Sequence, residues 1–355
     1  MSGPLSRRDI DAVLDAAAGL WSQLDGTRLF VTGGTGFIGT WLLETFLAAR
    51  ERFGLDAHAV VLTRNADAFA AKSPHIANDA AIELLSGDVR SFAFPPGEFR
   101  FVIHAATEAS AKLNNEQPRE MFDSIVTGTR RVLDFAVAAG TTRFLFTSSG
   151  AVYGRQPHDV DHVPEEYAGA PEITDARSAY GEGKRAAEAL CAMYAADHPA
   201  LQIAIARCFA FVGPHLPLDR HFAIGNFIGD ALAARPIEIR GDGTPLRSYL
   251  YAADLAIWLW MILFRGASMR PYNVGSEDSL SVLDTAQRVA AAVTPPPEVH
   301  VARRADPQRP AERYVPSTKR ARTELTLEQS VGLDDAIART IAWYRGGILE
   351  PWRRR

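Results

Sequence analysis

The chain has 355 residues and a formal net charge of −4, and 47% of its residues are hydrophobic and 23% charged. This length is ample for a large buried core, and the composition is ordinary for a globular protein. The small negative charge gives no electrostatic reason to expect a nucleic-acid partner. These numbers argue against a disordered chain and against a basic nucleic-acid-binding protein.

The number of cysteines and the length of the apolar runs indicate where in the cell the protein is expected. Only Cys191 and Cys208 occur, so neither a disulfide framework nor a thiolate metal site is expected. The longest apolar run, residues 255–264, is about half the roughly twenty residues that cross a bilayer, and it predicts a buried helix. The first residues lack the long apolar region of a secretory signal. We therefore expect a soluble cytoplasmic protein without a membrane partner.

The expected elements alternate along the first two hundred residues. Apolar residues recur near helical spacing over residues 5–21, which predicts a helix ahead of the main domain. The expected strands are residues 28–32, 57–63, 81–85, 101–104, 143–147 and 202–206, and the expected helices are residues 41–53, 116–139 and 179–198. This alternation predicts an α/β fold of Rossmann type, with a doubly wound parallel sheet covered on both faces.

The rhythm changes after residue 213, where proline and glycine become frequent, helical segments dominate, and strands such as residues 237–240 are brief. We expect a helical extension over residues 1–26 and an NAD(P)-binding Rossmann domain over residues 27–210. Residues 211–355 are expected to form a smaller, mostly helical lobe that mainly binds substrate. Whether segments of this lobe also enter the sheet is left open.

A glycine-rich turn stands between the first expected strand of the sheet and the helix after it, at residues 32–39. Gly34, Gly36 and Gly39 fit G-x-G-x-x-G, and Gly33, Gly36 and Gly39 fit the related G-x-x-G-x-x-G. Such glycines permit a tight turn and let the backbone approach a pyrophosphate, while the helix N-terminus favours the phosphate charge. The turn therefore predicts dinucleotide binding.

The next strand ends at Thr63, Arg64 and Asn65, without the acid that holds the ribose hydroxyls of NAD in many dinucleotide sites. Arg64 could meet the 2′-phosphate of NADP. It could equally be an exposed arginine beside an NAD that other contacts hold. The sequence leaves NAD and NADP both open, with NAD slightly favoured.

Several motifs occur in a fixed order: Gly33 to Gly39, Gly87-Asp-Val89, His104-Ala-Ala106, Ser148-Ser149, Tyr180-Gly-Glu-Gly-Lys184 and Tyr272-Asn-Val-Gly275. In this order they resemble the extended short-chain dehydrogenases/reductases. More narrowly, the chain is similar to the NAD-dependent epimerase/dehydratase family, whose members act on nucleotide sugars, and the likeness runs from about residue 28 to residue 344. The resemblance implies a homodimer paired through the helices at residues 116–139 and 179–198.

The resemblance also implies site residues. The expected catalytic residues are Ser149, Tyr180 and Lys184. The expected cofactor contacts are Gly33, Gly36, Phe37, Ile38, Gly39, Arg64, Asp88, Val89, Ala105, Ala106, Thr107, Tyr180, Lys184 and Phe209, with Asp88 and Val89 at the adenine. Besides Ser149, the expected substrate contacts are Arg247 at the diphosphate and Asn226 near the nucleotide phosphates. Ala210 departs from the family, because many relatives have an asparagine there that faces the substrate.

The chemistry of the catalytic group follows from the residue types. A phenol with a pKa near 10 is a poor base at neutral pH. Lys184 lies on the same helix face as Tyr180, and its charge together with a positive nicotinamide ring would lower the pKa of the phenol. Tyr180 could then take a proton from a sugar hydroxyl while Ser149 hydrogen-bonds the same oxygen. On spacing alone, an exposed helix pair is the commoner explanation. The position after a dinucleotide motif and a serine strand end favours catalysis.

Two carboxylates are missing. Relatives that dehydrate sugars usually place Asp and Glu directly before Val152-Tyr-Gly154, and decarboxylating relatives usually keep the Glu. This chain has Gly150 and Ala151 there. Glu108 could approach the site instead, or be a surface charge. The leading hypothesis is a 4-epimerase that oxidises C4 transiently. An NAD(P)H-dependent 4-keto-sugar reductase comes next, then a 4,6-dehydratase, and last a non-enzymatic dinucleotide-binding module.

No metal is expected, because the histidines are scattered without the spacing of metal ligands: His104, His158, His162, His215 and His221. His104 is interpreted as a core or cofactor-wall residue.

Overall fold

The fold is built on one parallel sheet of seven strands, in the order β11-β6-β5-β4-β1-β2-β3. The computed structural model describes residues 3–106, 111–219, 222–308, 310–346 and 350–353. The strands are β1 (Arg28–Thr32), β2 (His58–Thr63), β3 (Ile82–Ser86), β4 (Phe101–His104), β5 (Arg143–Ser149), β6 (Gln202–Cys208) and β11 (Pro271–Val274). The chain reverses its direction of winding between β1 and β4, as in doubly wound folds. The α/β Rossmann prediction is confirmed.

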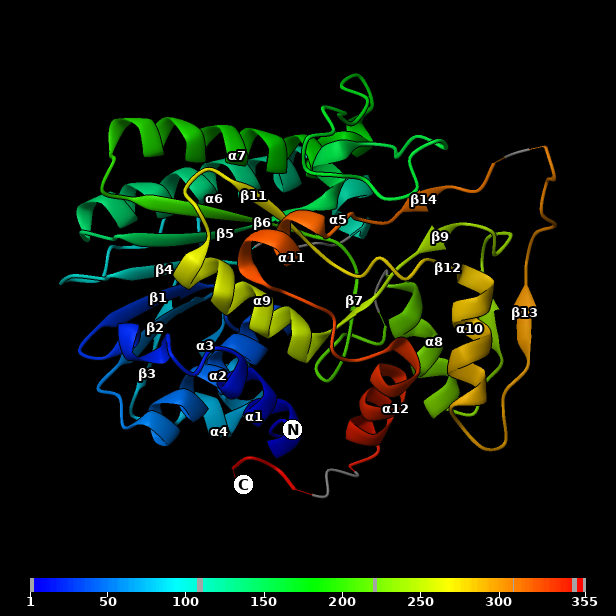
Figure 1. Cartoon of the computed structure of the whole chain (residues 1–355), viewed down its shortest axis with the longest axis horizontal. Coiled ribbons are helices and arrows are strands. Elements are labelled where there is room, and N and C mark those ends of the chain that lie inside the picture. Colours follow the sequence, from blue (N-terminus) through cyan, green and yellow to red (C-terminus); the bar gives the residue numbers. More distant parts are fainter. Residues whose placement is uncertain (1–2, 107–110, 220–221, 309, 347–349, 354–355) are drawn as a thin grey trace.

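Helices cover both faces of this sheet (Figure 1). On one face lie α6 (Pro118–Ala138) and α7 (Ala179–Asp197), and on the other lie α2 (Phe37–Phe53) and α9 (Ala252–Arg265). Phe30 and Val60 pack into the core under α6 and α7, whereas Leu29 and Val31 pack into the core with α2 and α9. Successive strand residues point to opposite faces, and both faces are buried. This is why the strands read as unbroken apolar runs.

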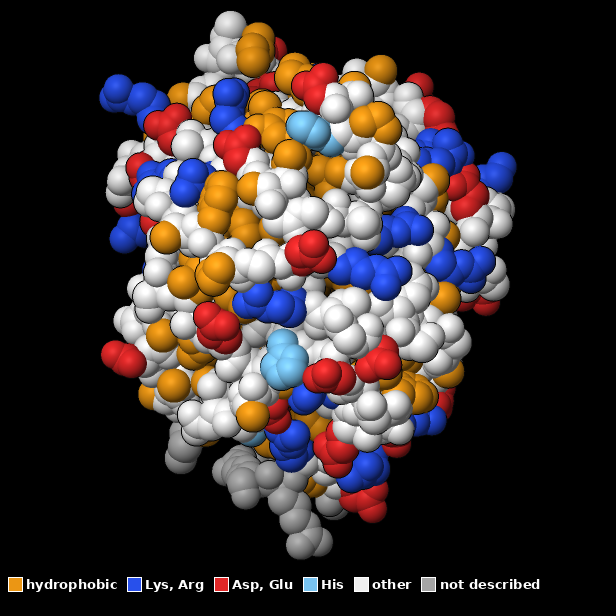
Figure 2. All heavy atoms as spheres, turned by 90° about the vertical axis from the view of Figure 1, so that its left-hand side faces the viewer, with side chains coloured by type: hydrophobic (Ala, Val, Ile, Leu, Met, Phe, Trp, Pro, Cys, Tyr) orange, Lys and Arg blue, Asp and Glu red, His pale blue; other side chains and the backbone are white. Residues whose placement is uncertain are grey.

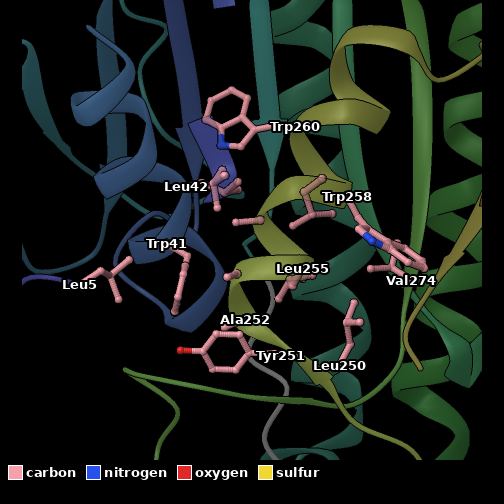
Figure 3. Close-up of a cluster of buried hydrophobic side chains, with 14 of the residues drawn as sticks. Leu5, Trp41, Leu42, Leu250, Tyr251, Ala252, Leu255, Trp258, Trp260 and Val274 are labelled. Atoms are coloured by element: carbon pink, nitrogen blue, oxygen red, sulfur yellow. The ribbon is translucent and has the colours of Figure 1, made fainter. Parts of the chain in front are cut away.

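The helix ahead of the main sheet, α1 (Arg7–Ala16), belongs to the larger core. Trp21 meets Trp260 edge to face with ring centroids 5.0 Å apart. The indole N–H of Trp260 donates to Thr45 Oγ1 at 2.8 Å, and that of Trp41 donates to the Pro214 carbonyl at 2.9 Å. Figure 3 shows Trp41 and Trp260 with their aliphatic neighbours from α2 and α9. Because each buried indole has a polar partner, these large side chains join the helices without an unpaired donor.

A buried carboxylate ties both ends of the chain to α2. Glu44 accepts hydrogen bonds from the Leu5 backbone N–H and from Trp352 Nε1, each at 2.7 Å. His215 Nε2 and His75 Nε2 each lie 3.2 Å from its other oxygen. Burial raises the pKa of Glu44, but the two imidazoles outweigh burial and bring this pKa down to about 2. No sequence pattern had singled out this cluster, because its members are far apart in the chain.

The C-terminal lobe combines helices with small sheets. Its helices are α8 (Ala223–Leu232), α10 (Val282–Ala291) and α12 (Leu333–Tyr344). Its strands are β7 (Phe211–Val212), β8 (Ile237–Ile239), β9 (Leu246–Arg247), β10 (Leu250–Tyr251), β12 (Leu280–Ser281), β13 (Val299–Val301) and β14 (Arg313–Tyr314). Apart from β8, these strands were not predicted. Each has only two or three residues, which is too short for a periodic pattern to show in the sequence. One strand of the main sheet, β11, comes from the part of the chain after residue 210. The division into domains stays a prediction.

The remaining elements are short: η1 (Trp21–Leu24), α3 (Ala66–Lys72), α4 (Pro74–Ala77), α5 (Ala111–Glu116), η2 (Gly150–Tyr153), η3 (Ala176–Ser178) and α11 (Lys319–Leu325). Within the described ranges, no helix is both long and apolar enough to cross a membrane. Acidic and basic side chains both occur across the face drawn in Figure 2, which agrees with the small net charge.

Candidate active site

The predicted motifs lie where four strands of the main sheet end: β1, β4, β5 and β6. Thr32 is the register partner of His104 across β1 and β4, and Ser149 is the partner of Cys208 across β5 and β6. Because these strands are parallel, the segments that follow them lie at one edge of the sheet. Ligands bind at this edge in open α/β folds, next to the point where the winding reverses. The glycine turn, Ala105 and Ser149 therefore share one region.

The glycine turn packs too closely for side chains. A Cβ at Gly33, where φ is +73°, would lie 2.5 Å from the carbonyl of Ala105, and one at Gly39 would lie 2.3 Å from Gly33 O. Gly36 is the N-cap of α2, and Phe37 and Ile38 form the first turn of that helix. Gly36 has no side chain to cap the first-turn N–H groups, so they remain available to an anion. These residues fit a dinucleotide pyrophosphate.

His104 holds the backbone beside the turn. Its Nδ1 lies 2.7 Å from Thr32 Oγ1, which also accepts a hydrogen bond from the Ala106 N–H at 3.1 Å. Its Nε2 lies 3.0 Å from Thr129 Oγ1. Burial, with the charge of Lys184, lowers the pKa of His104 to about 3, so the ring is neutral. Thr107 and Glu108, named from the sequence, lie outside the described residues.

Charged side chains gather where β2 and β3 end. Asp88 accepts two hydrogen bonds from the Arg90 guanidinium, at 2.8 and 3.0 Å, and Arg90 also donates to Glu120 at 2.7 Å. These bonds hold the pKa of Asp88 below its usual value, and the nearby charge of Arg64 adds to the effect. Val89 packs under α6, where a Cβ at Gly128 would lie 2.8 Å from it. The carboxylate of Asp88 and the guanidinium group of Arg90 thus lie together at the predicted adenine end of the cofactor site.

The predicted catalytic residues come from β5 and α7. Ser149 is 5% exposed, and its Oγ accepts a hydrogen bond from the Ala151 N–H at 3.1 Å. The hydroxyl of Tyr180, in the first turn of α7, interacts with that of Ser149. Lys184, one turn later, is 2% exposed and donates to the Thr147 carbonyl at 2.7 Å. The structure therefore brings the three residues to the same strand end.

The protein groups alone do not lower the pKa of the phenol. Burial raises the pKa of Tyr180 to about 12, and the interaction with Ser149 opposes this rise. Burial also lowers the pKa of Lys184 to about 8. The lowering of the Tyr180 pKa by Lys184 and a bound nicotinamide therefore stays a prediction.

The neighbouring serine is engaged elsewhere. Ser148 Oγ donates to Glu188 Oε1 at 2.5 Å, and Arg207 donates to both oxygens of the same carboxylate, at 3.0 and 2.7 Å. Glu188 thus joins α7 to β5 and β6. This arrangement supports the choice of Ser149 over Ser148.

One residue of the site was missed by the sequence reasoning. The hydroxyl of Tyr314, in β14, interacts with that of Ser149, and the ring centroid of Tyr314 lies 4.7 Å from that of Phe209. A Cβ at Gly150 would lie 2.7 Å from the Phe209 ring and 2.8 Å from Tyr314 Oη. The space beside Gly150 is therefore filled by two aromatic side chains. A single tyrosine in a two-residue strand carries no sequence signal that could have revealed it.

The two predicted substrate residues differ in what surrounds them. Arg247 is the register partner of Tyr314 across β9 and β14, and its charge acts on the Tyr314 hydroxyl. Its Nη1 donates to the Leu246 carbonyl at 2.8 Å. Asn226 lies half-buried on α8, where its backbone N–H donates to the Phe222 carbonyl at 3.0 Å. Arg247 thus lies on the strand beside Tyr314, whereas the described part of the chain shows no link between the Asn226 side chain and the predicted catalytic residues.

The sheet order and the close-packed glycine turn define a dinucleotide-binding protein of the Rossmann class. The chain belongs to the NAD dependent epimerase/dehydratase family, whose model matches residues 29–275. The family assignment from the motifs is confirmed. The expectation that the protein is an enzyme of this NAD-dependent family is confirmed with it.

Relatives and solved structures agree on this family. The chain is 30% identical to UDP-glucuronic acid decarboxylase 6 of Arabidopsis thaliana over 310 residues, which cover 87% of this chain and 86% of the relative. It is 28% identical to UDP-glucuronic acid decarboxylase 1 of the same plant over 325 residues, covering 91% and 71%. The UDP-glucose 4-epimerase of Thermus thermophilus in complex with NAD superposes with a TM-score of 0.74 at 25% identity, covering 90% of this chain and all (100%) of that chain.

Proposed function

We propose that this enzyme modifies a nucleotide-activated sugar with NAD or NADP as cofactor, and that it acts as a 4-epimerase. The names of its relatives support the substrate class, since they act on UDP-glucuronic acid or UDP-glucose. The epimerase assignment is narrower and depends on the side chains around Ser149.

The observation that carries it is the set of groups around Gly150. The hydroxyls of Tyr180 and Tyr314 interact with Ser149, while Gly150 and Ala151 stand where relatives that eliminate water usually have Asp and Glu. Two carboxylates near this strand end are engaged: Glu188 binds Ser148 and Arg207, and Glu165 accepts from the Asn273 N–H at 2.9 Å. Among the residues that the structure describes, this strand end offers hydroxyls and no unengaged carboxylate, which suits a reaction that needs only redox and proton transfer at one carbon.

The chain's own residues would divide the work. NAD(P), held by the glycine turn, supplies the oxidising and reducing equivalents. Tyr180 removes the proton of the sugar 4-hydroxyl and returns it after the sugar has turned, while Ser149 donates a hydrogen bond to the same oxygen. Arg247 pairs with the diphosphate of the substrate. The charge of the buried Lys184, together with the nicotinamide ring, lowers the pKa of Tyr180.

Two other reactions are consistent with particular observations. A 4-keto-sugar reductase is favoured by Arg64, whose charge acts on Asp88 at the predicted adenine end and would suit NADPH. Decarboxylation is favoured by the names of the relatives, but Ala151 replaces the glutamate expected for it.

The test is product analysis on a panel of UDP- and dTDP-hexoses and UDP-glucuronic acid, with NAD or NADPH added. An epimerase yields a product of unchanged mass and new retention time, and Tyr180→Phe removes it. Loss of water, or of carbon dioxide, would replace the proposal by a dehydratase or a decarboxylase. A substrate reduced only with NADPH would establish the reductase.

The cofactor is tested separately, by denaturing the purified protein and identifying the nucleotide that it releases. Tightly bound NAD is expected for a redox-neutral epimerase. A preference for added NADPH over NADH would support the reductase and assign Arg64 to the 2′-phosphate.

A further inference from the structure

Lys184 and Glu188 reach adjacent residues of β5 from successive turns of α7. Lys184 Nζ donates a hydrogen bond to the Thr147 carbonyl at 2.7 Å, and Ser148 Oγ donates to Glu188 Oε1 at 2.5 Å. Residues four apart lie on the same face of a helix. Lys184 is 2% exposed, and the Glu188 side chain is 13% exposed. An ammonium and a carboxylate therefore share the interior between α7 and β5.

The charge of Lys184 is held in surroundings that oppose it. Its Nζ lies 4.8 Å from the centre of the Phe146 ring, and burial lowers the pKa of Lys184 to about 8. The titratable groups around it come from three elements: Tyr180, Glu188 and Cys191 from α7, Cys208 from β6 and His104 from β4.

Most of these neighbours cannot balance the ammonium. Burial raises the pKa of the tyrosine and of both thiols and lowers the pKa of the histidine, so all four are neutral near pH 7 in the protein alone. Among the groups just named from the described residues, Glu188 alone is negative. Its charge raises the pKa of Lys184 against the effect of burial.

Arg207 fixes the carboxylate in this place. Its Nε and Nη2 donate to the two oxygens of Glu188 at 3.0 and 2.7 Å, and its Nη1 donates to Tyr153 Oη at 2.9 Å. With Ser148 on one oxygen and the guanidinium on both, Glu188 has no freedom to turn away from α7. The charge beside Lys184 is therefore part of a rigid joint between α7, β5 and β6.

We propose that Glu188 is a positioning residue, which Arg207 and Ser148 hold in place so that the ammonium of Lys184 stays charged at the end of β5. The inference rests on the proposed function, in which the charge of Lys184 acts on Tyr180. Loss of the carboxylate would remove the negative charge and leave the guanidinium of Arg207 buried without its partner. Both changes favour the neutral amine of Lys184.

The experiment follows the ionisation of Lys184 directly, in the protein saturated with NAD. The chain has only four lysines, Lys72, Lys112, Lys184 and Lys319, so lysine labelled at Cε gives a simple NMR spectrum over a pH series. Lys184→Met identifies the Lys184 resonance. In Glu188→Gln the ionisation midpoint of Lys184 should fall by about one pH unit. From a midpoint near 8, such a fall leaves roughly half of the molecules without the charge at pH 7.

Two controls separate charge from packing. Glu182→Gln makes the same change on the same helix, at a carboxylate that lies 3.6 Å from Arg185, and should leave the midpoint unchanged. Ser148→Ala removes one hydrogen bond from Glu188 and keeps the charge, so the midpoint should stay close to that of the wild type. An equal fall in Ser148→Ala would assign the effect to loosened packing and overturn the inference.

A second variant covers the case in which Glu188→Gln does not fold. The double change Glu188→Met with Arg207→Met replaces the pair by apolar side chains, which buried ion pairs often tolerate. The carboxylate is absent here too, so the midpoint should again fall. An unchanged or higher midpoint in a folded variant that lacks the carboxylate would refute the role of Glu188.

The two proposals fail separately. If no nucleotide sugar is converted, the proposed function fails, and the NMR comparison still decides whether Glu188 keeps Lys184 charged. If a sugar is converted, the alkaline limb of kcat/KM should move to lower pH in Glu188→Gln and stay in place in Glu182→Gln. A lowered rate with an unmoved limb would indicate a merely structural role for Glu188.

Discussion

Ser148 donates a hydrogen bond to Glu188 at 2.5 Å, from inside the sheet, while the adjacent Ser149 lies at the strand end with the tyrosine hydroxyls. Two neighbouring serines therefore have different surroundings. We expect Ser149→Ala to lower kcat by about 100-fold, as loss of one oxygen-stabilising donor does in other enzymes. The matched variant Ser148→Ala should mainly lower stability, by roughly 1–2 kcal/mol. Turnover and thermal melting of both variants check this, and equal turnover would contradict it.

Tyr180→Phe should reduce turnover by about 100- to 10,000-fold, because it removes the proton-transferring group and keeps the ring. Cofactor binding should change little. Single-turnover kinetics together with NAD titration measure the two effects. Activity within a few-fold of wild type would show that another group is the base.

Lys184→Met should raise stability at neutral pH while it abolishes activity. Burial lowers the pKa of Lys184 from 10.5 to about 8, so the unfolded chain binds more protons between these two values. Unfolding free energy therefore rises with pH across that window, and below it the buried charge costs about 1–3 kcal/mol. Chemical denaturation at a series of pH values checks this. The slope between pH 8 and 10.5 should weaken in Lys184→Met.

Glu44→Gln should destabilise the protein at neutral pH and flatten its acid denaturation. The folded pKa of Glu44, about 2, lies below the ordinary glutamate value of 4.5, so the stabilising contribution of Glu44 is present above the upper value and is lost as pH falls through the lower one. The loss should be on the order of 3 kcal/mol. Urea unfolding between pH 7 and pH 3 measures it. Parallel curves for the two proteins would contradict the prediction.

Gly33→Ala should abolish dinucleotide binding, because its Cβ would lie 2.5 Å from the Ala105 backbone at a φ of +73°. Gly54→Ala is the control, since Gly54 also has a positive φ, +65°, but has open space around its Cβ position. The control should cost about 1 kcal/mol of stability and leave binding intact. Calorimetric titration with NAD and NADP distinguishes steric closure of the turn from backbone strain alone.

Local patterns were enough to predict the sheet and its glycine turn. The strands of the main sheet are apolar on both faces, and the turn stands directly between β1 and α2, so adjacent residues determine both. Ser149, Tyr180 and Lys184 could be named because their motifs are short and ordered. The choice of Ser149 over Ser148 gained its physical reason only when Glu188 was seen to bind Ser148.

The tertiary structure decided what the sequence could not. Tyr314 reaches Ser149 only because β14 pairs with β9 in the C-terminal lobe, and Glu44 gathers His75, His215 and Trp352 from distant segments. Periodicity and motifs report on neighbours along the chain, whereas these contacts depend on how the lobe packs against the sheet. By itself the sequence determined the class of fold and predicted the cofactor turn and the catalytic residues; only packing decided which further side chain lies beside Ser149 and what fills the space beside Gly150.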